Sequence, residues 1–105
     1  MDKRYFKIDG KEYPCKLSYK AYKEFEARFK PLSQLRETIE DGAKLFFCGL
    51  IAACSSDGIE FPMDFEAFEN WMDDNLRAFN DFKNFQTVGT QEKGKKLKNV
   101  KSPSA

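Results

Sequence analysis

The sequence contains no histidine, and other features of common enzymes are absent with it. Histidine is the commonest general base and a common metal ligand. There is no glycine-rich phosphate loop, and Asp57-Gly58 lacks the further ligands of a calcium loop. Asp73 and Asp74 are adjacent, so on a helix they point about 100° apart and form no carboxylate pair. We expect no enzyme activity, no catalytic residues, no metal and no cofactor.

Cysteine and long hydrophobic runs are also scarce. The three cysteines, Cys15, Cys48 and Cys54, show no paired spacing, which argues against a disulfide framework. The longest apolar stretch runs from Leu45 to Cys54, whereas a membrane span needs about 20 residues. The N-terminal letters MDKRYFKID contain no run of signal-peptide type. We therefore expect a soluble protein of a reducing cytoplasm, with no membrane partner.

Phenylalanine is abundant in this short chain. Eleven of the sixteen aromatic residues are Phe, in a sequence of 105 residues that suits one domain. Phenylalanine buries a large area and carries no polar group. This composition favours packing or protein contact over polar chemistry.

Charge is distributed unevenly although the net charge is only +1. Residues 1–36 carry +5, residues 37–86 carry −8 and residues 87–105 carry +4. The letters KRYFK at 3–7 and the Lys-rich end mix cations with aromatics, as single-strand binders do. However, residues 1–86 are net −3, and a dedicated nucleic-acid domain is usually basic overall. Nucleic acid is therefore the weaker candidate partner. The uneven charge either steers partners or self-association, or it marks only three solvated faces of different sign, and the two interpretations are equally favoured.

The first elements are predicted to be a β-hairpin and a helix. Asp9-Gly10 is a favoured two-residue turn that pairs Ile8 with Lys11. Alternation then places one apolar face on the hairpin: Phe6, Ile8, Tyr13, Cys15 and Leu17. A lone hairpin is marginal in water, so this face must lie on helices. Ser18 is a predicted N-cap for the helix that follows, which Pro31 ends.

Further helices are predicted downstream. A weak helical segment spans residues 33–40, and Asp41 is the predicted cap of an apolar helix over 42–54. Gly49 in the middle of this helix lowers helix stability by about 1 kcal/mol relative to Ala. The missing side chain would allow another element to approach closely there. Phe61 and Pro62 are expected to open the next helix, and Asn75 either caps a last helix or lies within a continuous one. The fold class is α+β, mainly α: an N-terminal two-stranded β-hairpin followed by a compact bundle of four to five helices.

An apolar stripe that rotates around its helix is the predicted partner surface. It consists of Leu76, Phe79, Phe82 and Phe85. A spacing of three residues lags the helical repeat by about 60° per step, so its two ends face opposite sides. We expect Leu76 and Phe79 to pack inward and Phe82 and Phe85 to lie partly exposed, for self-association or for capture of an apolar helix. The alternative is that Phe82 and Phe85 fold under the hairpin and belong to the core.

The composition changes after Phe85. Residues 87–105 contain no aromatics, two glycines and five lysines. Such a segment cannot bury enough area to offset its ordering entropy. The predicted organisation is one globular domain over residues 1–86 and a disordered Lys-rich tail over 87–105.

The order of elements resembles a known family. The letters FKIDGKEYPCKLSYKAYKEFEARF, then LFFCGLIAACSSDG, then the acidic DFEAFENWMDD look like the small tail assembly chaperones of tailed bacteriophages and prophages. The resemblance covers about residues 5–86, and the segment Phe61-Pro62-Met63 departs from the Ser or Thr cap usual there. It implies a non-enzymatic protein of the bacterial host cytoplasm that binds the tape-measure protein and helps to recruit tail-tube subunits. The alternatives are a structural tail or connector component retained in the particle, or a nucleic-acid-binding accessory protein.

Overall fold

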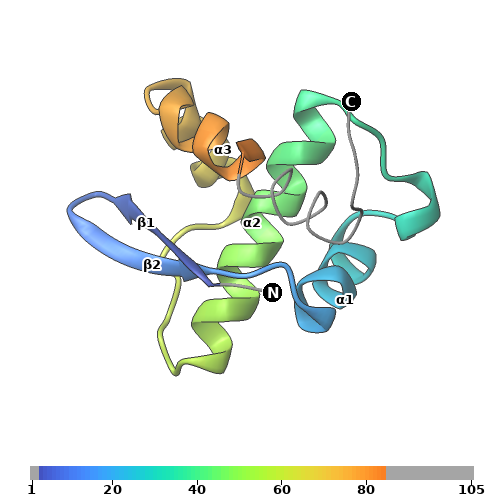
Figure 1. Ribbon diagram of the computed structural model, residues 1–105, viewed down its shortest axis with the longest axis horizontal. Helices are drawn as coiled ribbons and strands as arrows, with labels where there is room; N and C mark the ends of the chain where they lie inside the picture. Colours follow the sequence, from blue (N-terminus) through green and yellow to red (C-terminus); the bar gives the residue numbers. More distant parts are fainter. Residues whose placement is uncertain (1–2, 85–105) are drawn as a thin grey trace, which may run out of the picture.

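A computed structural model describes residues 3–84 of the chain. The elements are β1 (Arg4–Ile8), β2 (Lys11–Cys15), α1 (Tyr19–Arg28), the 3-10 turn η1 (Leu32–Gln34), α2 (Ile39–Ser56) and α3 (Phe65–Asp73). The chain is helical again over residues 76–84. Figure 1 shows α2 running through the middle of the molecule, with the hairpin and α3 on one side and α1 on the other. The fold is α+β and mainly α, as predicted.

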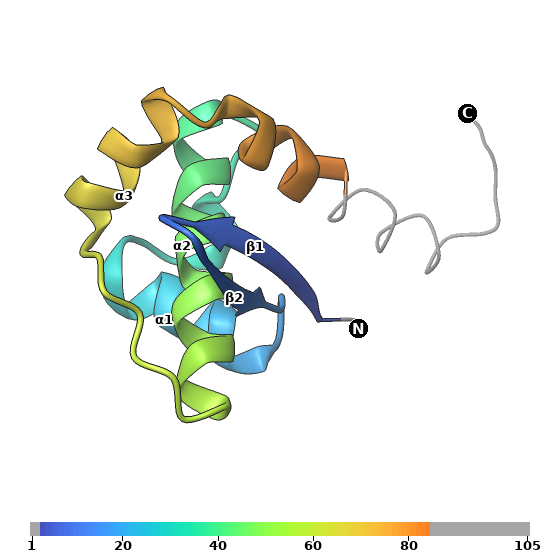
Figure 2. The same ribbon diagram turned by 90° about the vertical axis from the view of Figure 1, so that its left-hand side faces the viewer.

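The hairpin has the predicted turn and register. Asp9 and Gly10 both adopt positive φ, 52° and 85°, as a two-residue turn requires. Ile8 pairs with Lys11 and Arg4 with Cys15. Every residue of the predicted apolar face is buried: Phe6, Ile8, Tyr13, Cys15 and Leu17. Strand β2 lies against α2, so a helix covers this face (Figure 2).

Helix α1 begins where its sequence predicts. The Ser18 hydroxyl accepts a hydrogen bond from the Ala21 backbone N–H at 3.3 Å, which satisfies one free donor of the first turn. Helical structure ends at Arg28, shortly before Pro31. Phe25 is fully buried on the face that α1 packs against α2.

The start of α2 differs from the prediction. The cap is Thr38, whose Oγ1 accepts from the Asp41 backbone N–H at 3.1 Å, so Asp41 lies within the first turn. The separate helix predicted over 33–40 is wrong, because η1 ends at Gln34, residues 35–38 are not helical and Ile39 and Glu40 already belong to α2. Thr38 is extended, with φ −117° and ψ 161°. Thr38 and Asp41 have the Thr-x-x-Asp spacing of a capping box, which places Thr38 at the cap, while the Asp41 carboxylate bonds Lys30 and the Arg36 backbone.

Close approach of the hairpin to α2 explains the mid-helix glycine. The Lys16 backbone N–H donates to the Gly49 carbonyl at 3.2 Å. A Cβ at position 49 would lie 2.8 Å from Cys15 Sγ and 3.4 Å from Leu17 Cδ2. The absence of a side chain thus lets the end of β2 rest directly on the helix, as the sequence suggested.

The chain after α2 forms two separate helices. Residues 57–64 are not helical, and Asp64 caps α3 by accepting from the Ala67 N–H at 2.8 Å. The prediction that Phe61 and Pro62 open this helix is therefore wrong by a few residues. A break at Asp74 and Asn75 separates α3 from the helix over 76–84, where the Ala78 N–H donates to the Asn75 carbonyl. Asn75 thus stands at the start of a separate last helix, as in the first of the two predicted arrangements, but its side-chain amide donates back to the Trp71 carbonyl at 2.7 Å.

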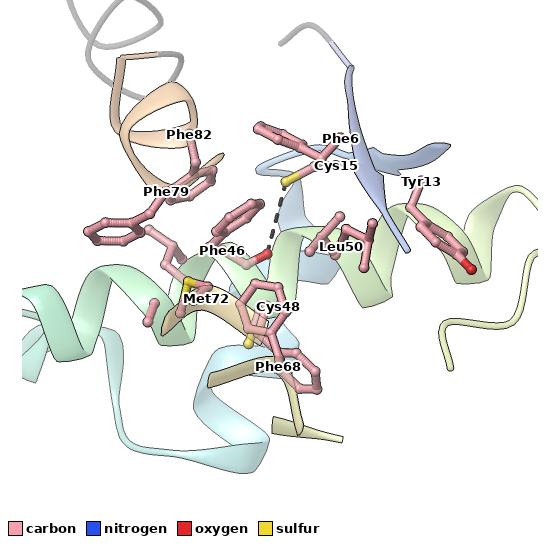
Figure 3. Close-up of a cluster of buried hydrophobic side chains, with 14 of the residues drawn as sticks. Phe6, Tyr13, Cys15, Phe46, Cys48, Leu50, Phe68, Met72, Phe79 and Phe82 are labelled. Atoms are coloured by element: carbon pink, nitrogen blue, oxygen red, sulfur yellow. Dashed lines mark hydrogen bonds between the residues drawn. The ribbon is translucent and has the colours of Figure 1, made fainter. Parts of the chain in front are cut away.

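One hydrophobic cluster joins side chains from the hairpin, α1, α2, α3 and the last helix. Figure 3 shows Phe46 of α2 near its centre, below Phe79 and Phe82. The Phe6, Phe68 and Phe82 rings all contact Phe46, with centroids between 4.6 and 5.1 Å away. The predicted tail over 87–105 and Phe85 lie outside the described residues.

Candidate functional site

The predicted partner-binding stripe is distributed differently from the expectation. Leu76 is 62% exposed, Phe79 is 6% exposed and Phe82 is completely buried. The expectation of an inward Leu76 and a partly exposed Phe82 is wrong, and the alternative that Phe82 belongs to the core is confirmed. Phe85 lies outside the described residues. A partner-binding role for the stripe stays a prediction, of which Leu76 is the described member that is open to solvent.

Packing of the last helix against the start of α2 causes this pattern. Phe82 stacks on Phe46, and a Cβ at Gly42 would lie 3.1 Å from the Phe79 ring. These contacts place Phe79 and Phe82 against the first half of α2. Ile39 is itself 73% exposed. Neither Leu76 nor Ile39 packs against the hydrophobic core cluster.

The main candidate site is an open groove of about 540 Å³ between α2 and the segment that leads into α3, and its lining is part polar and part apolar. Its lining residues come from α1, α2 and the segment over 59–64: Arg28, Phe47, Ile51, Ser55, Ile59, Phe61, Pro62, Met63 and Asp64. Apolar side chains form its floor, and the two charged residues stand at its rim. We call this set the α2 groove.

The floor of the α2 groove is held by ring contacts. The Phe61 ring meets the rings of Tyr13, Phe47 and Phe68, with centroids 5.3, 6.0 and 6.2 Å away. Arg28 places its guanidinium 5.7 Å from the Phe47 ring and donates to Glu24 at 2.8 Å. These contacts fix Phe61 and Arg28, while Ile51 and Met63 stay partly exposed above them.

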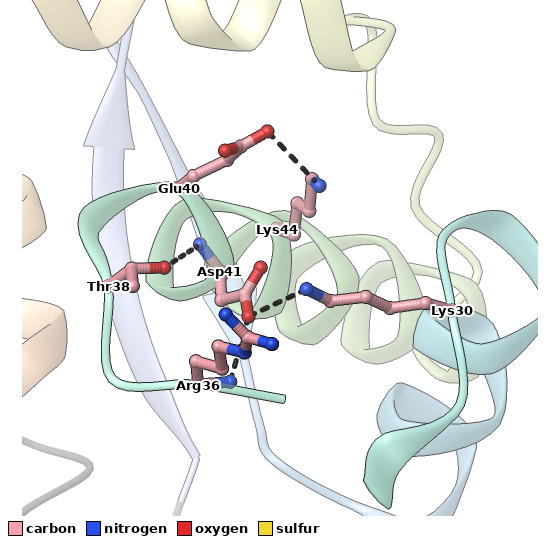
Figure 4. A network of polar contacts seen from close by, with 6 residues as sticks. All are labelled: Lys30, Arg36, Thr38, Glu40, Asp41 and Lys44. Atoms are coloured by element: carbon pink, nitrogen blue, oxygen red, sulfur yellow. Dashed lines mark hydrogen bonds and ion pairs between the residues drawn. The ribbon is translucent and has the colours of Figure 1, made fainter. Parts of the chain in front are cut away.

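The buried carboxylate of Asp41 lies elsewhere and has a structural role (Figure 4). Its Oδ2 accepts from Lys30 Nζ at 2.9 Å and from the Arg36 N–H at 2.8 Å. The bond from Lys30, helped by the bond from the Arg36 backbone, holds the pKa of Asp41 below its usual value. The carboxylate thereby ties the loop over 29–38 to α2, and both of its donors come from the protein itself.

The cysteines are packed as small hydrophobic residues. All three are buried and free of disulfides. Burial raises the pKa of Cys48 to about 12 and raises the pKa of Cys15 further. Cys15 Sγ points at the Phe46 carbonyl, 4.0 Å away. Because the thiolate is the nucleophilic form, these environments suppress cysteine reactivity.

The part of the chain that the structure describes offers little for other chemistry. Within residues 3–84, no group of three or more Cys, Asp or Glu side chains is placed to hold a metal ion. No helix in that range has the length and apolar character to cross a membrane.

Sequence reasoning missed most of the α2 groove. Helical periodicity places Ile51 in an apolar row of α2, but it assigns Ile59, Phe61 and Met63 to a linker and a helix start. A signal for the groove is present in the sequence, because these three residues alternate with Glu60 and Pro62. Such alternation puts apolar side chains on one side of an extended segment.

Comparisons of the chain with protein-family models, with curated proteins and with solved structures found no match.

Proposed function

We propose that this protein is a tail assembly chaperone of a tailed phage or prophage that acts in the host cytoplasm without catalysis. It binds an apolar helical segment of the tape-measure protein and helps to recruit tail-tube subunits. The single observation that supports this best is the α2 groove, an open surface at which the partly exposed apolar side chains of Ile51, Ile59 and Met63 gather. The resemblance of residues 5–86 to that family supplies the identity of the partners.

The shape and lining of the α2 groove suit a peptide helix better than a small molecule. Small-molecule sites enclose most of their ligand, whereas this groove is open to solvent. Its accessible apolar side chains, Ile51, Ile59 and Met63, are the kind that anchor the apolar face of an amphipathic helix. Methionine is flexible and adapts to different partner side chains.

A fixed floor also favours binding. The Phe61 ring is already held by three neighbouring rings, so its ordering costs nothing more when a partner arrives. At the rim, Arg28 and Asp64 carry opposite charges, which allows them to orient a partner helix that has charges at matching ends.

Co-purification of the full chain with a tagged tape-measure protein tests the groove. Ile51→Asp and Met63→Asp place a charge on a partly exposed surface, so both variants should fold and should lose most of the captured partner. Ile39→Asp is the matched control, because it adds the same charge at a 73% exposed apolar residue outside the groove. Retention of the partner by both groove variants, with normal melting curves, would refute the groove assignment.

The same co-purification experiment also tests the predicted role of Leu76. Leu76→Asp changes an exposed residue that does not line the α2 groove. Loss of partner capture in this variant alone would move the binding surface to the start of the last helix and would support the original stripe.

A structural tail component is the alternative function. A chaperone leaves before the particle is complete, whereas a tail or connector component stays. Mass spectrometry of purified particles separates the two: the chaperone should be absent from finished tails and present in complexes with free tape-measure protein. Stoichiometric recovery from finished particles would favour the structural component.

A further inference from the structure

A basic depression lies on the surface away from the α2 groove. It has a volume of about 260 Å³, and its lining comes from the start of β1, the β2–α1 connection, α1 and the end of α2: Lys3, Lys16, Ser18, Tyr19, Lys20, Ala53, Ser56 and Asp57. Three lysines thus converge on it from three positions in the sequence. Asp57 is the one carboxylate in this lining.

The three ammonium groups are not equally engaged. Lys3 Nζ pairs with Asp57 Oδ2 at 2.9 Å, and Lys20 Nζ reaches Ser56 Oγ at 3.5 Å. Lys16 is half-buried, and its Nζ makes no hydrogen bond or ion pair with another residue of the described range 3–84. Lys3 and Lys20 thus each contact a side chain at the C-terminal end of α2, a position that favours cations. With three lysines and one carboxylate, the lining of the depression has a net positive charge.

Two exposed tyrosines adjoin the depression. Tyr19 lines it and is 78% exposed, and Tyr5 is 55% exposed beside Lys3. Lys3 Nζ lies 6.0 Å from the Tyr5 ring centre, and Lys23 Nζ lies 5.9 Å from that of Tyr19. Neither ring takes part in the aromatic core. The surface therefore offers cations and exposed aromatic rings side by side.

We propose that this surface, defined by Lys3, Lys16, Lys20, Tyr5 and Tyr19, binds single-stranded nucleic acid. Phosphate groups lie in the depression against the lysines, and unpaired bases stack on the two tyrosine rings. Cationic grooves flanked by aromatic rings bind single strands in this way without reading their sequence. An acidic peptide would use the lysines but would leave the two rings unused.

Net charge alone hides this surface. Residues 57–81 carry eight acids and one arginine, whereas residues 3–36 carry ten basic and four acidic residues. Most of these acidic residues lie on α3 and next to it, whereas the three lysines lie together near the end of α2. The net charge of the whole domain therefore does not describe the charge at this surface. The proposed activity is independent of the α2 groove and of the partner bound there.

Fluorescence anisotropy of the full chain with labelled twelve-nucleotide dT and U strands tests the proposal. Lys16→Gln/Lys20→Gln should weaken binding and make its salt dependence shallower, by about 0.7 per lost phosphate contact in the log–log slope. Lys7→Gln/Lys11→Gln removes the same charge near the hairpin turn, at the far end from Lys3, and should bind like the unchanged protein. Tyr19→Ala should weaken binding roughly five-fold or more, whereas Tyr19→Phe keeps the ring and should retain it.

Several results would overturn the proposal. The first is no binding of either strand at about 50 mM salt, a low concentration chosen because it favours phosphate contacts. The second is that the Lys16→Gln/Lys20→Gln variant binds as tightly as the unchanged protein. The Lys95→Gln/Lys96→Gln variant then shows whether the lysines near the C-terminus carry the affinity. Tighter binding of a duplex than of a single strand would exclude stacking. Salt-sensitive self-association without nucleic-acid binding would assign the lysines to the acidic face of a second copy.

Discussion

The ring of Phe82 lies flat against the ring of Phe46, with their centroids 4.6 Å apart and their planes 9° from parallel. Both side chains are fully buried. This stacked pair joins the last described helix to α2, and it makes a residue that was predicted to meet a partner into a part of the core.

Truncation of Phe82 should therefore destabilise the domain strongly. Phe82→Ala removes a buried ring and should lower the free energy of unfolding by about 3–5 kcal/mol. Leu76→Ala, on the same helix but exposed, should change it by no more than about 0.5 kcal/mol. Urea unfolding followed by circular dichroism measures both. Equal, small effects would mean that the last helix is not part of the cooperative unit.

Gly49 and Cys15 should behave as a coupled pair. Gly49→Ala raises helix propensity, but its new Cβ would lie 2.8 Å from Cys15 Sγ, so we expect a net loss of about 1–3 kcal/mol. Cys15→Ala removes the sulfur, and the methyl group introduced at position 49 then fills part of the space. In a double-mutant cycle the two changes should couple by at least about 0.5 kcal/mol, the double variant being more stable than the sum predicts. Strict additivity would show that the hairpin moves away without cost.

Asp41 should contribute to stability at neutral pH and not in acid. Its folded-state pKa is lowered, so the unfolded chain binds its proton first as pH falls. The contribution is therefore fully present above the unfolded-state pKa of about 3.9 and is lost as pH falls further through the folded-state pKa. Asp41→Asn should lower the melting temperature at pH 7 and should differ less from the unchanged protein at pH 3. Glu40→Gln, whose side chain is 72% exposed, is the control and should show little effect at either pH.

The buried thiols should impose the opposite pH dependence. Burial raises the folded-state pKa of Cys48 to about 12, so stability is fully present below the unfolded-state pKa of about 8.5 and falls as pH rises toward 12. Cys48→Ala should reduce the slope of stability against pH between pH 8 and 10. Native protein should react with a thiol reagent far more slowly than urea-unfolded protein. Rapid native labelling of all three cysteines would contradict their burial.

The hairpin and the first helix are determined by short stretches of sequence. Asp9-Gly10 dictates a turn that only a few residue pairs adopt, and once the turn is set the pairing of Ile8 with Lys11 and the inward face follow by alternation. Ser18 is the sole strong cap before its apolar stripe, so the helix start is equally local. The interactions responsible connect residues at most a few positions apart.

Where two residues compete for one role, the tertiary structure decides. Thr38 and Asp41 are both capable caps for α2, and in the fold the Asp41 carboxylate is bonded instead to Lys30 and the Arg36 backbone, which the chain brings to it. No local rule contains those contacts. The convergence of Lys3, Lys16 and Lys20 on one depression likewise appears only when the hairpin is packed beside the end of α2.

The burial of Phe82 shows why the sequence alone does not tell which side of the last helix faces the core. A helical repeat shows that Leu76 and Phe82 face different directions, but it does not show which direction points to the core. That choice depends on which helix lies alongside, because the free energy gained by burying a ring comes from the partner surface as much as from the ring. The sequence by itself determined the elements, the hairpin register and an apolar composition that demands a core. Only the packing of the last helix over Gly42 and Phe46 decided that Phe79 and Phe82 are inside and Leu76 is outside.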